Sequence, residues 1–111
     1  MGFDLSGHGG YFSWTASGWY ALLDLAQDHG WTAIGTGAPR GTLKRDWPGI
    51  YDSNEGQLFY ARDAREFAAA LERFLATKRV KARHSDFDSP SARSSLREFI
   101  EFCREGSFRI Y

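Results

Sequence analysis

The sequence is poor in cysteine, proline and methionine, and it has no excess of charge of either sign. Cys103 is the single cysteine among 111 residues, so an intramolecular disulfide is excluded. The 14 basic residues balance 14 acidic ones, which excludes a strong overall attraction to nucleic acid or to an anionic membrane. No apolar run approaches the roughly 18 residues that a membrane span requires, and no leader pattern follows Met1. We therefore expect a cytoplasmic protein in a reducing compartment, with no membrane contact.

What the chain does contain is an ordinary globular composition with many aromatic residues. Its residues are 42% hydrophobic and 25% charged, which suits a single globular domain over residues 1–111. Such a domain buries about two-thirds of its unfolded surface, so it needs no disulfide or metal, and we expect no cofactor. The 9 Phe, 5 Tyr and 4 Trp exceed what so small a core must enclose. Some of them are candidates for a binding surface, and a bulky core with a few rings at its rim is the simpler alternative.

Residues 47–60 give the clearest hairpin pattern in the chain. Two apolar runs, residues 49–51 and 57–60, flank a polar turn at residues 52–56. Gly56 can adopt the positive φ that closes a type I turn followed by a bulge, and Asn54 can hydrogen-bond the turn backbone. The pattern predicts two antiparallel strands paired across this turn.

The spacing of apolar residues predicts three amphipathic helices. The first covers residues 18–29, with Thr15 or Ser17 as its cap. The second covers residues 64–77, where Asp63 and Glu66 have the spacing of a capping box. The third begins after Ser89 or Ser91, with Pro90 in its first turn, and Gly106 ends it.

Short alternating segments complete the predicted fold. Residues 1–5, 31–36 and 107–111 each alternate as a strand does, and residues 78–89 have the low apolar content of a loop. With the hairpin, this gives four or five short strands. The sequence therefore predicts an α+β domain, in which a small antiparallel or mixed sheet packs against three helices on one face.

A glycine-rich loop with basic neighbours is a candidate ligand site. Its members are Gly35, Gly37, Arg40, Lys44 and Arg45. Backbone N–H groups in such loops hold phosphates, and His8 in the flexible N-terminal loop is a further candidate. The third glycine comes one residue late for the dinucleotide fingerprint, and the loop lacks the ending of a P-loop. Binding of a nucleotide or another anion at residues 35–44 is thus one hypothesis, and a plain surface connection is the other.

Other patterns of reactive residues have simpler explanations. Residues 52–56 begin like a calcium loop, but their glycine is one position early and a hairpin turn accounts for them. His84, Asp86 and Asp88 could ligate a metal from an extended loop, yet ordinary polar loop residues look the same. Asp4 and His8 have no nucleophile beside them, and Cys103 lies on the apolar face of a helix as a core thiol. We identify no catalytic residue and no metal site, and expect a protein that is not an enzyme.

The basic run from Lys78 to Arg83 is the one segment suited to nucleic acid. Lysine and arginine side chains can follow a phosphate backbone, and aromatic residues nearby could stack bases. Acidic residues flank the run, and the total charge is balanced. A solvated loop explains the run better, so nucleic-acid contact is the weakest functional hypothesis.

A surface for a partner protein is the leading hypothesis. Large rigid aromatic side chains dominate protein-binding hot spots, and no catalytic set competes with this interpretation. The candidate residues are Tyr11, Trp14, Trp47, Tyr51, Asn54 and Tyr60. The sequence thus predicts a small accessory protein that binds a partner, with anion binding by the glycine-rich loop as the alternative.

Several segments resemble a loosely defined group of short bacterial and phage proteins of unknown function. They are the opening MGFDL, the helical stretch WYALLDLA, the turn SNEGQ and the ending REFIEFCREGSFRIY. The resemblance spans most of the chain and implies a stand-alone accessory protein, sometimes carried by phages. The group has no assigned active site, so no functional residue follows from it. The SNEGQ turn recurs in the group, for its turn chemistry or for a binding role.

Overall fold

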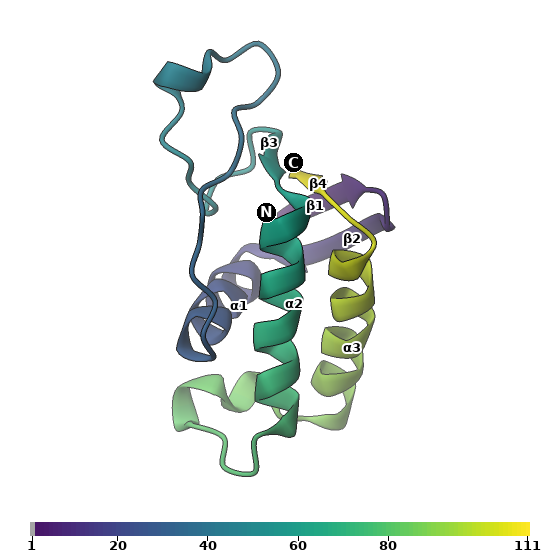
Figure 1. Cartoon of the computed structure of the whole chain (residues 1–111). Coiled ribbons are helices and arrows are strands. Elements are labelled where there is room, and N and C mark those ends of the chain that lie inside the picture. The colour runs from purple at the N-terminus through teal and green to yellow at the C-terminus, as the bar shows by residue number, and fades with distance from the viewer. Residues whose placement is uncertain (1) are drawn as a thin grey trace.

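The protein is a two-layer α+β domain in a computed structural model that describes residues 2–111 (Figure 1). Four strands, β1 (Gly2–Gly7), β2 (Gly10–Thr15), β3 (Gln57–Phe59) and β4 (Phe108–Ile110), form an antiparallel sheet in the order β2-β1-β4-β3. Helices α1 (Ala16–Asp28), α2 (Ala61–Ala76) and α3 (Pro90–Arg104) pack on one face of it. The predicted fold class is confirmed. Met1, included in the first predicted strand, lies outside the described residues.

The hairpin of the fold joins β1 to β2, at the N-terminal end of the chain. Its strands pair from Gly2 with Thr15 to Gly7 with Gly10. His8 and Gly9 form the turn, and Gly10 has a φ of 97°, a conformation that glycine adopts without strain. On β1, Phe3 and Leu5 are buried while their neighbours are exposed, so one face of the sheet meets the helices and the other faces outward.

The hairpin predicted at residues 47–60 is wrong in its first strand. Residues 49–51 form no strand, whereas β3 pairs with β4 from the far end of the chain. The turn at residues 52–56 is nevertheless formed, because the buried Gln57 side chain makes hydrogen bonds to the backbone of the turn. Gln57 Nε2 donates to the Ser53 carbonyl at 2.6 Å, and Oε1 accepts from Glu55 N at 2.9 Å. Gly56 has a φ of 87°, as predicted.

Aromatic side chains fill most of the core. Eight of the nine phenylalanines are buried, and so are Trp19 and Trp31. The rings of Phe59 and Phe108 stack across β3 and β4 with centroids 4.7 Å apart, and Phe67 of α2 meets Phe59 edge to face. Most of the aromatic side chains therefore pack in the core. Cys103 is also buried, which raises the pKa of its thiol, as expected of a core cysteine.

Two of the three predicted helix caps are confirmed. Thr15 Oγ1 accepts from Gly18 N at 3.0 Å, and Ser89 Oγ accepts from Ala92 N at 3.2 Å, with Pro90 in the first turn of α3. The predicted cap at Asp63 is wrong, because α2 begins earlier and Tyr60 precedes it without a side-chain cap. Asp63 instead lies in the first turn, with its side chain directed into the protein.

The connection between α1 and β3 is long and almost free of regular structure. The strand predicted at residues 31–36 is absent, and a single bridge pairs Gly37 with Leu58 of β3. Beyond that bridge the chain extends to one end of the molecule and carries the short 3-10 helix η1 (Lys44–Asp46) at its tip (Figure 1). We call residues 37–56 the loop extension.

Residues 78–89 hold more structure than the loop predicted there. They contain the 3-10 helix η2 (Ala82–Phe87), whose His84 and Phe87 are buried against the helices. Because the segment is mostly polar, the sequence did not indicate that these two residues are buried. None of the helices formed by residues 2–111 combines the length and the apolar character needed to cross a membrane.

Candidate anion-binding site

The outward face of the sheet carries an open groove of about 430 Å³. It lies over β1 and β4, next to the base of the loop extension. Cross-strand pairing places Ser6, Arg109 and Leu58 in one row, since Arg109 is opposite both of the others. The adjacent row, with Leu5 and Ile110, is buried beneath the helices, so the row with Arg109 points outward.

Arg109 lines the groove, and a backbone carbonyl holds its guanidinium group. Its Nη1 donates to the carbonyl oxygen of Gly56 at 2.8 Å. Within residues 2–111, no carboxylate forms an ion pair with Arg109. The rest of this guanidinium fork is therefore positioned but not neutralised, which is the arrangement that suits a phosphate or carboxylate ligand.

Arg40 reaches the groove from the loop extension. The bridge between Gly37 and Leu58, with N–H···O bonds of 2.8 and 2.9 Å, fixes the loop to the edge of the sheet. A turn follows in which Thr42 N donates to the Pro39 carbonyl at 3.0 Å, and Gly41 takes the positive φ of 88°. Arg40 is exposed and, like Arg109, forms no ion pair with any described carboxylate.

His8 supplies a third basic side chain to the lining of the groove. It belongs to the turn between β1 and β2, where its N–H donates to the Ser107 carbonyl at 3.3 Å. Its ring rests on Gly106, because a Cβ there would lie 3.1 Å from His8 Cδ2. The hydroxyl-bearing residues Ser6, Ser107 and Tyr111 also line the groove. They offer neutral hydrogen-bonding groups between the three basic side chains.

The groove is locally positive although the chain as a whole is neutral. Two arginines and a histidine line it, and no aspartate or glutamate among residues 2–111 does. Asp4 of β1 faces the same side of the sheet, but its Oδ1 accepts a hydrogen bond from the Tyr11 hydroxyl at 2.6 Å. This bond is the main reason why the pKa of Tyr11 is raised. The geometry favours an anion beside Arg40 and Arg109, away from Asp4.

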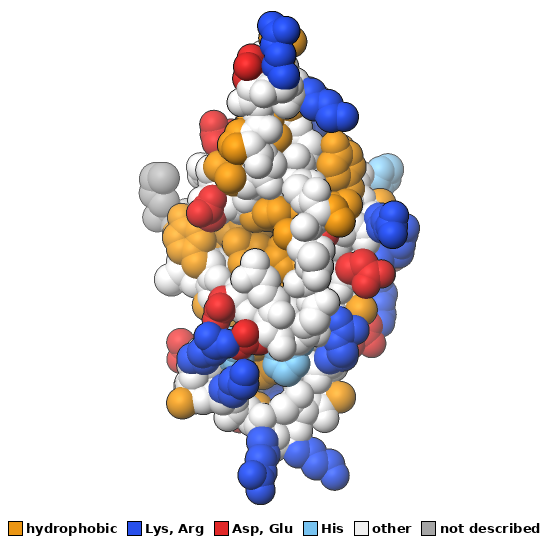
Figure 2. Space-filling model, turned by 60° about the vertical axis from the view of Figure 1, so that its left-hand side comes forward, with side chains coloured by type: hydrophobic (Ala, Val, Ile, Leu, Met, Phe, Trp, Pro, Cys, Tyr) orange, Lys and Arg blue, Asp and Glu red, His pale blue; other side chains and the backbone are white. Residues whose placement is uncertain are grey.

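Of the five residues predicted for a ligand site, the structure brings only Arg40 into the groove. Gly37 anchors the loop, and Gly35 N is bonded to the Tyr51 hydroxyl at 2.8 Å, so it does not face a ligand. Lys44 and Arg45 belong to η1, at the tip of the loop extension; basic side chains lie at this upper end of the molecule and also at its lower end in Figure 2. Arg109 was missed, although alternation with buried Phe108 and Ile110 could have placed it outward.

The six residues predicted for partner binding do not form one surface. Tyr11 is 65% exposed on β2 and Tyr60 is 40% exposed before α2, and Asn54 is exposed in its turn. Trp14 faces inward, against Phe87 and Phe99. The polar atoms of the other two residues, Trp47 and Tyr51, form hydrogen bonds within the protein.

Trp47 and Tyr51 hold the base of the loop extension. Trp47 Nε1 donates to the Thr36 carbonyl at 3.1 Å. The Tyr51 hydroxyl donates to one oxygen of Asp63, and Trp31 Nε1 donates to the other at 2.8 Å. Burial raises the pKa of Asp63, and burial together with the Asp63 contact raises the pKa of Tyr51.

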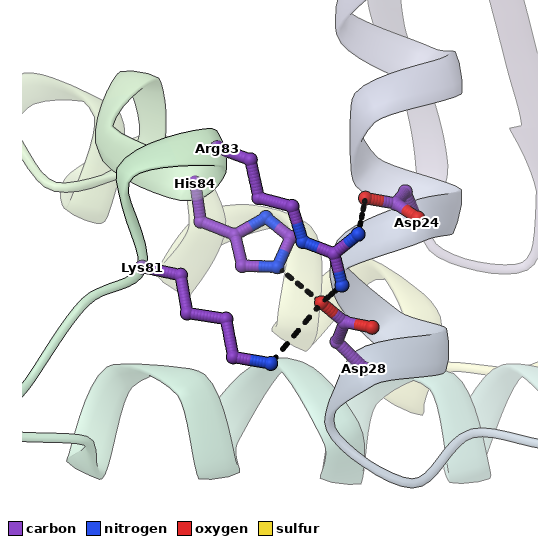
Figure 3. Close-up of polar contacts among 5 residues, drawn as sticks. All are labelled: Asp24, Asp28, Lys81, Arg83 and His84. Atoms are coloured by element: carbon purple, nitrogen blue, oxygen red, sulfur yellow. Dashed lines mark hydrogen bonds and ion pairs between the residues drawn. The ribbon is translucent and has the colours of Figure 1, made fainter.

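A second cluster of charged residues lies where η2 meets α1 (Figure 3). His84 Nε2 is 2.7 Å from Asp28 Oδ2, and Arg83 and Lys81 also pair with this carboxylate. The bond from His84 is the main cause that lowers the pKa of Asp28. Arg83 further contacts Asp24 at 3.8 Å. Two of the cations in the predicted basic run, Lys81 and Arg83, therefore belong to an ion-pair cluster within the protein.

The metal site considered at His84, Asp86 and Asp88 is not assembled. Asp88 pairs with Arg93 at 2.9 Å, and His84 turns toward Asp28. Among residues 2–111, only Asp24, Asp28 and His84 bring ligand atoms within 4.8 Å of one another. The Arg83 guanidinium contacts both aspartates, so a cation of the protein itself neutralises this group.

The geometry thus points to the groove as the site where a ligand would meet unneutralised charge. In comparisons with protein-family models, curated proteins and solved structures, none matched this chain.

Proposed function

We propose that this protein binds a small phosphate-bearing anion in the groove on the outward face of its sheet. The observation that supports this most is that Arg40 and Arg109, from distant parts of the sequence, line one groove and pair with no carboxylate in the part of the chain that the structure describes. A phosphate bound in this groove would accept charge-assisted hydrogen bonds from guanidinium groups, which are among the stronger hydrogen bonds in proteins. The groove volume of about 430 Å³ lies within the usual range for small-molecule sites.

Calorimetric titration with pyrophosphate tests the proposal. Arg40→Gln and Arg109→Lys should each weaken binding about tenfold or more, because a hydrogen bond to a charged group contributes about 1.5–3 kcal/mol and 1.4 kcal/mol corresponds to tenfold. Arg109→Lys keeps the charge but loses the planar fork. A ligand at a hundredfold excess over its Kd should also raise the free energy of unfolding by about 2.7 kcal/mol.

The matched control is Lys44→Gln, which removes the same charge from the tip of the loop extension. It should leave pyrophosphate affinity unchanged, apart from the weak long-range effect that salt screens. Equal weakening by Lys44→Gln and Arg40→Gln would show general attraction by the basic surface and would contradict a defined site. Absence of binding by the unchanged protein across phosphate, pyrophosphate and sugar phosphates would remove the proposal.

Binding of a partner protein is the second proposal. Tyr11, Asn54 and Tyr60 remain its candidates, because these three are exposed. They lie on different elements, and no further observation joins them to one partner surface. We also propose a cytoplasmic location, on the single cysteine and its burial.

A further inference from the structure

We infer that the anion is a mononucleotide, whose phosphate lies at Arg109 and Arg40 and whose base stacks on Tyr111. This inference rests on the proposed function and names the class of ligand. Tyr111 lines the groove and is 48% exposed. It follows Arg109 by two positions, so the two side chains point to the same side of the sheet, roughly 7 Å apart along the strand direction.

The backbone of Tyr111 is held by two hydrogen bonds to Asp4, as it would be in a strand. Its N–H donates to the Asp4 carbonyl at 2.7 Å, and its carbonyl accepts from Asp4 N at 2.8 Å. One part of its ring lies against Gly56, where a Cβ would be only 3.3 Å from Tyr111 Cε1. A ring that is supported at one edge and open elsewhere is a preformed stacking surface, so binding need not immobilise it.

Gly56 positions both parts of this site. Its carbonyl oxygen holds the Arg109 guanidinium, and its missing side chain makes room for the Tyr111 ring. Gly56 is itself buried, with a positive φ, in the turn that the Gln57 side chain braces. The SNEGQ turn thus places a phosphate-binding fork beside an aromatic ring. Inorganic phosphate would use only the fork, whereas a nucleotide would use both.

The charge pattern favours a single nucleotide over a nucleic-acid strand. A strand crossing the sheet from β4 toward β2 would carry its next phosphates past Asp4 and Tyr11. The Asp4 carboxylate faces that side and would repel them. Arg40 and Arg109 are the two arginines that line the groove, and its volume of about 430 Å³ suits one small molecule.

Titration calorimetry on the full chain with AMP, UMP, ribose 5-phosphate and adenosine tests this inference. We expect both nucleotides to bind about tenfold or more tightly than ribose 5-phosphate, because stacking on an aromatic side chain adds affinity for any base. Tyr111→Leu, which keeps an apolar side chain against Gly56 but lacks a π face, should abolish that difference. Its affinity for ribose 5-phosphate should stay the same. Tyr111→Phe should retain the difference, and Tyr20→Ala is the control for an equally exposed tyrosine, on α1 and outside the groove.

The outcomes separate the two proposals. If ribose 5-phosphate binds as tightly as AMP, and Tyr111→Leu changes neither, the base is not recognised; the inference is overturned while anion binding stands. If adenosine binds as tightly as AMP, the phosphate contributes nothing and the proposed function is contradicted. If none of the four compounds binds, both fail.

Discussion

At the scale of single residues, Asp63 shows how a sequence motif can mislead. Asp63 and Glu66 have the spacing of a capping box, yet Asp63 is only 1% exposed and accepts hydrogen bonds from Trp31 and Tyr51. These donors come from residues 32 and 12 positions away. A local pattern cannot reveal which distant donors will bind a carboxylate, and through Tyr51 this carboxylate is one of the groups that hold the loop extension.

Removal of the Asp63 carboxylate should destabilise the protein strongly. Asp63→Ala leaves the Trp31 and Tyr51 donors buried without an acceptor, at about 1–3 kcal/mol for each. We expect a loss of about 2–5 kcal/mol in urea unfolding. Tyr51→Phe leaves the Trp31 bond but removes the bonds that the Tyr51 hydroxyl forms with Asp63 and Gly35 N, so it should cost less, about 1–3 kcal/mol. Equal losses for the two variants would contradict the assigned network.

The same carboxylate should give a distinctive pH dependence. Burial raises the pKa of folded Asp63 above the roughly 3.9 of an unfolded chain, so the folded state holds this proton more tightly. The resulting stability is full below about pH 3.9 and is lost as pH rises through the folded pKa. The unfolding free energy lost in Asp63→Asn, which cannot ionise, should therefore be larger at pH 4 than at pH 7. A loss that grows with pH would contradict this sign.

At the scale of elements, η2 is attached to α1 by few interactions. Its polar sequence resembles a loop, and His84 and Phe87 are its only buried residues. The cluster at Asp28 adds ion pairs to these two contacts. Segments with so few buried residues open more easily than the core and are visible in hydrogen exchange.

Weakening the Asp28 cluster should loosen η2 without unfolding the domain. The pKa of folded Asp28 is lowered, chiefly by His84, so its stabilising effect is present above the unfolded pKa of about 3.9 and is lost as pH falls through the folded value. At pH 7, Asp28→Asn should speed amide exchange several-fold in residues 78–88 and leave α2 and α3 protected. Asp24→Asn is the control, since the one ion pair that Asp24 forms within residues 2–111 is with Arg83, at 3.8 Å. Unchanged exchange in Asp28→Asn would show that Phe87 packing alone holds η2.

At the scale of the whole molecule, the loop extension is tied into the core. Trp19 Nε1 donates to the Tyr51 carbonyl at 2.7 Å, in addition to the bonds from the Tyr51 hydroxyl to Asp63 and from Trp47 Nε1 to the Thr36 carbonyl. The domain has a radius of gyration of 13.6 Å, near the roughly 13 Å of a compact chain of this length. The base of the extension therefore belongs to the same cooperative unit as the sheet and helices.

Unfolding should follow a single transition. We expect tryptophan fluorescence and far-ultraviolet circular dichroism to give coincident urea curves, with a free energy of unfolding of about 5–15 kcal/mol. An earlier fluorescence transition that disappears in Trp47→Phe would show that the extension melts separately. That outcome would also mean that Arg40 is not held over the groove.

The sequence by itself determined the elements whose causes are local. Apolar spacing gave the three helices, Thr15 and Ser89 are caps because their hydroxyls reach the first turn, and Gly56 takes a conformation that other residues avoid. Alternation likewise placed Phe108 and Ile110 inward in β4. Each of these features follows from interactions between residues that are close in the sequence, so it does not depend on how the rest of the chain folds.

Only the tertiary structure decided which distant segments meet. It paired β3 with β4, gave Asp63 its donors, and brought Arg40, Arg109 and His8 to one groove. Periodicity tells which way a side chain points, but it cannot tell what lies opposite. Partners that lie far apart in the sequence are chosen by the packing of the whole core, which also determines the candidate site.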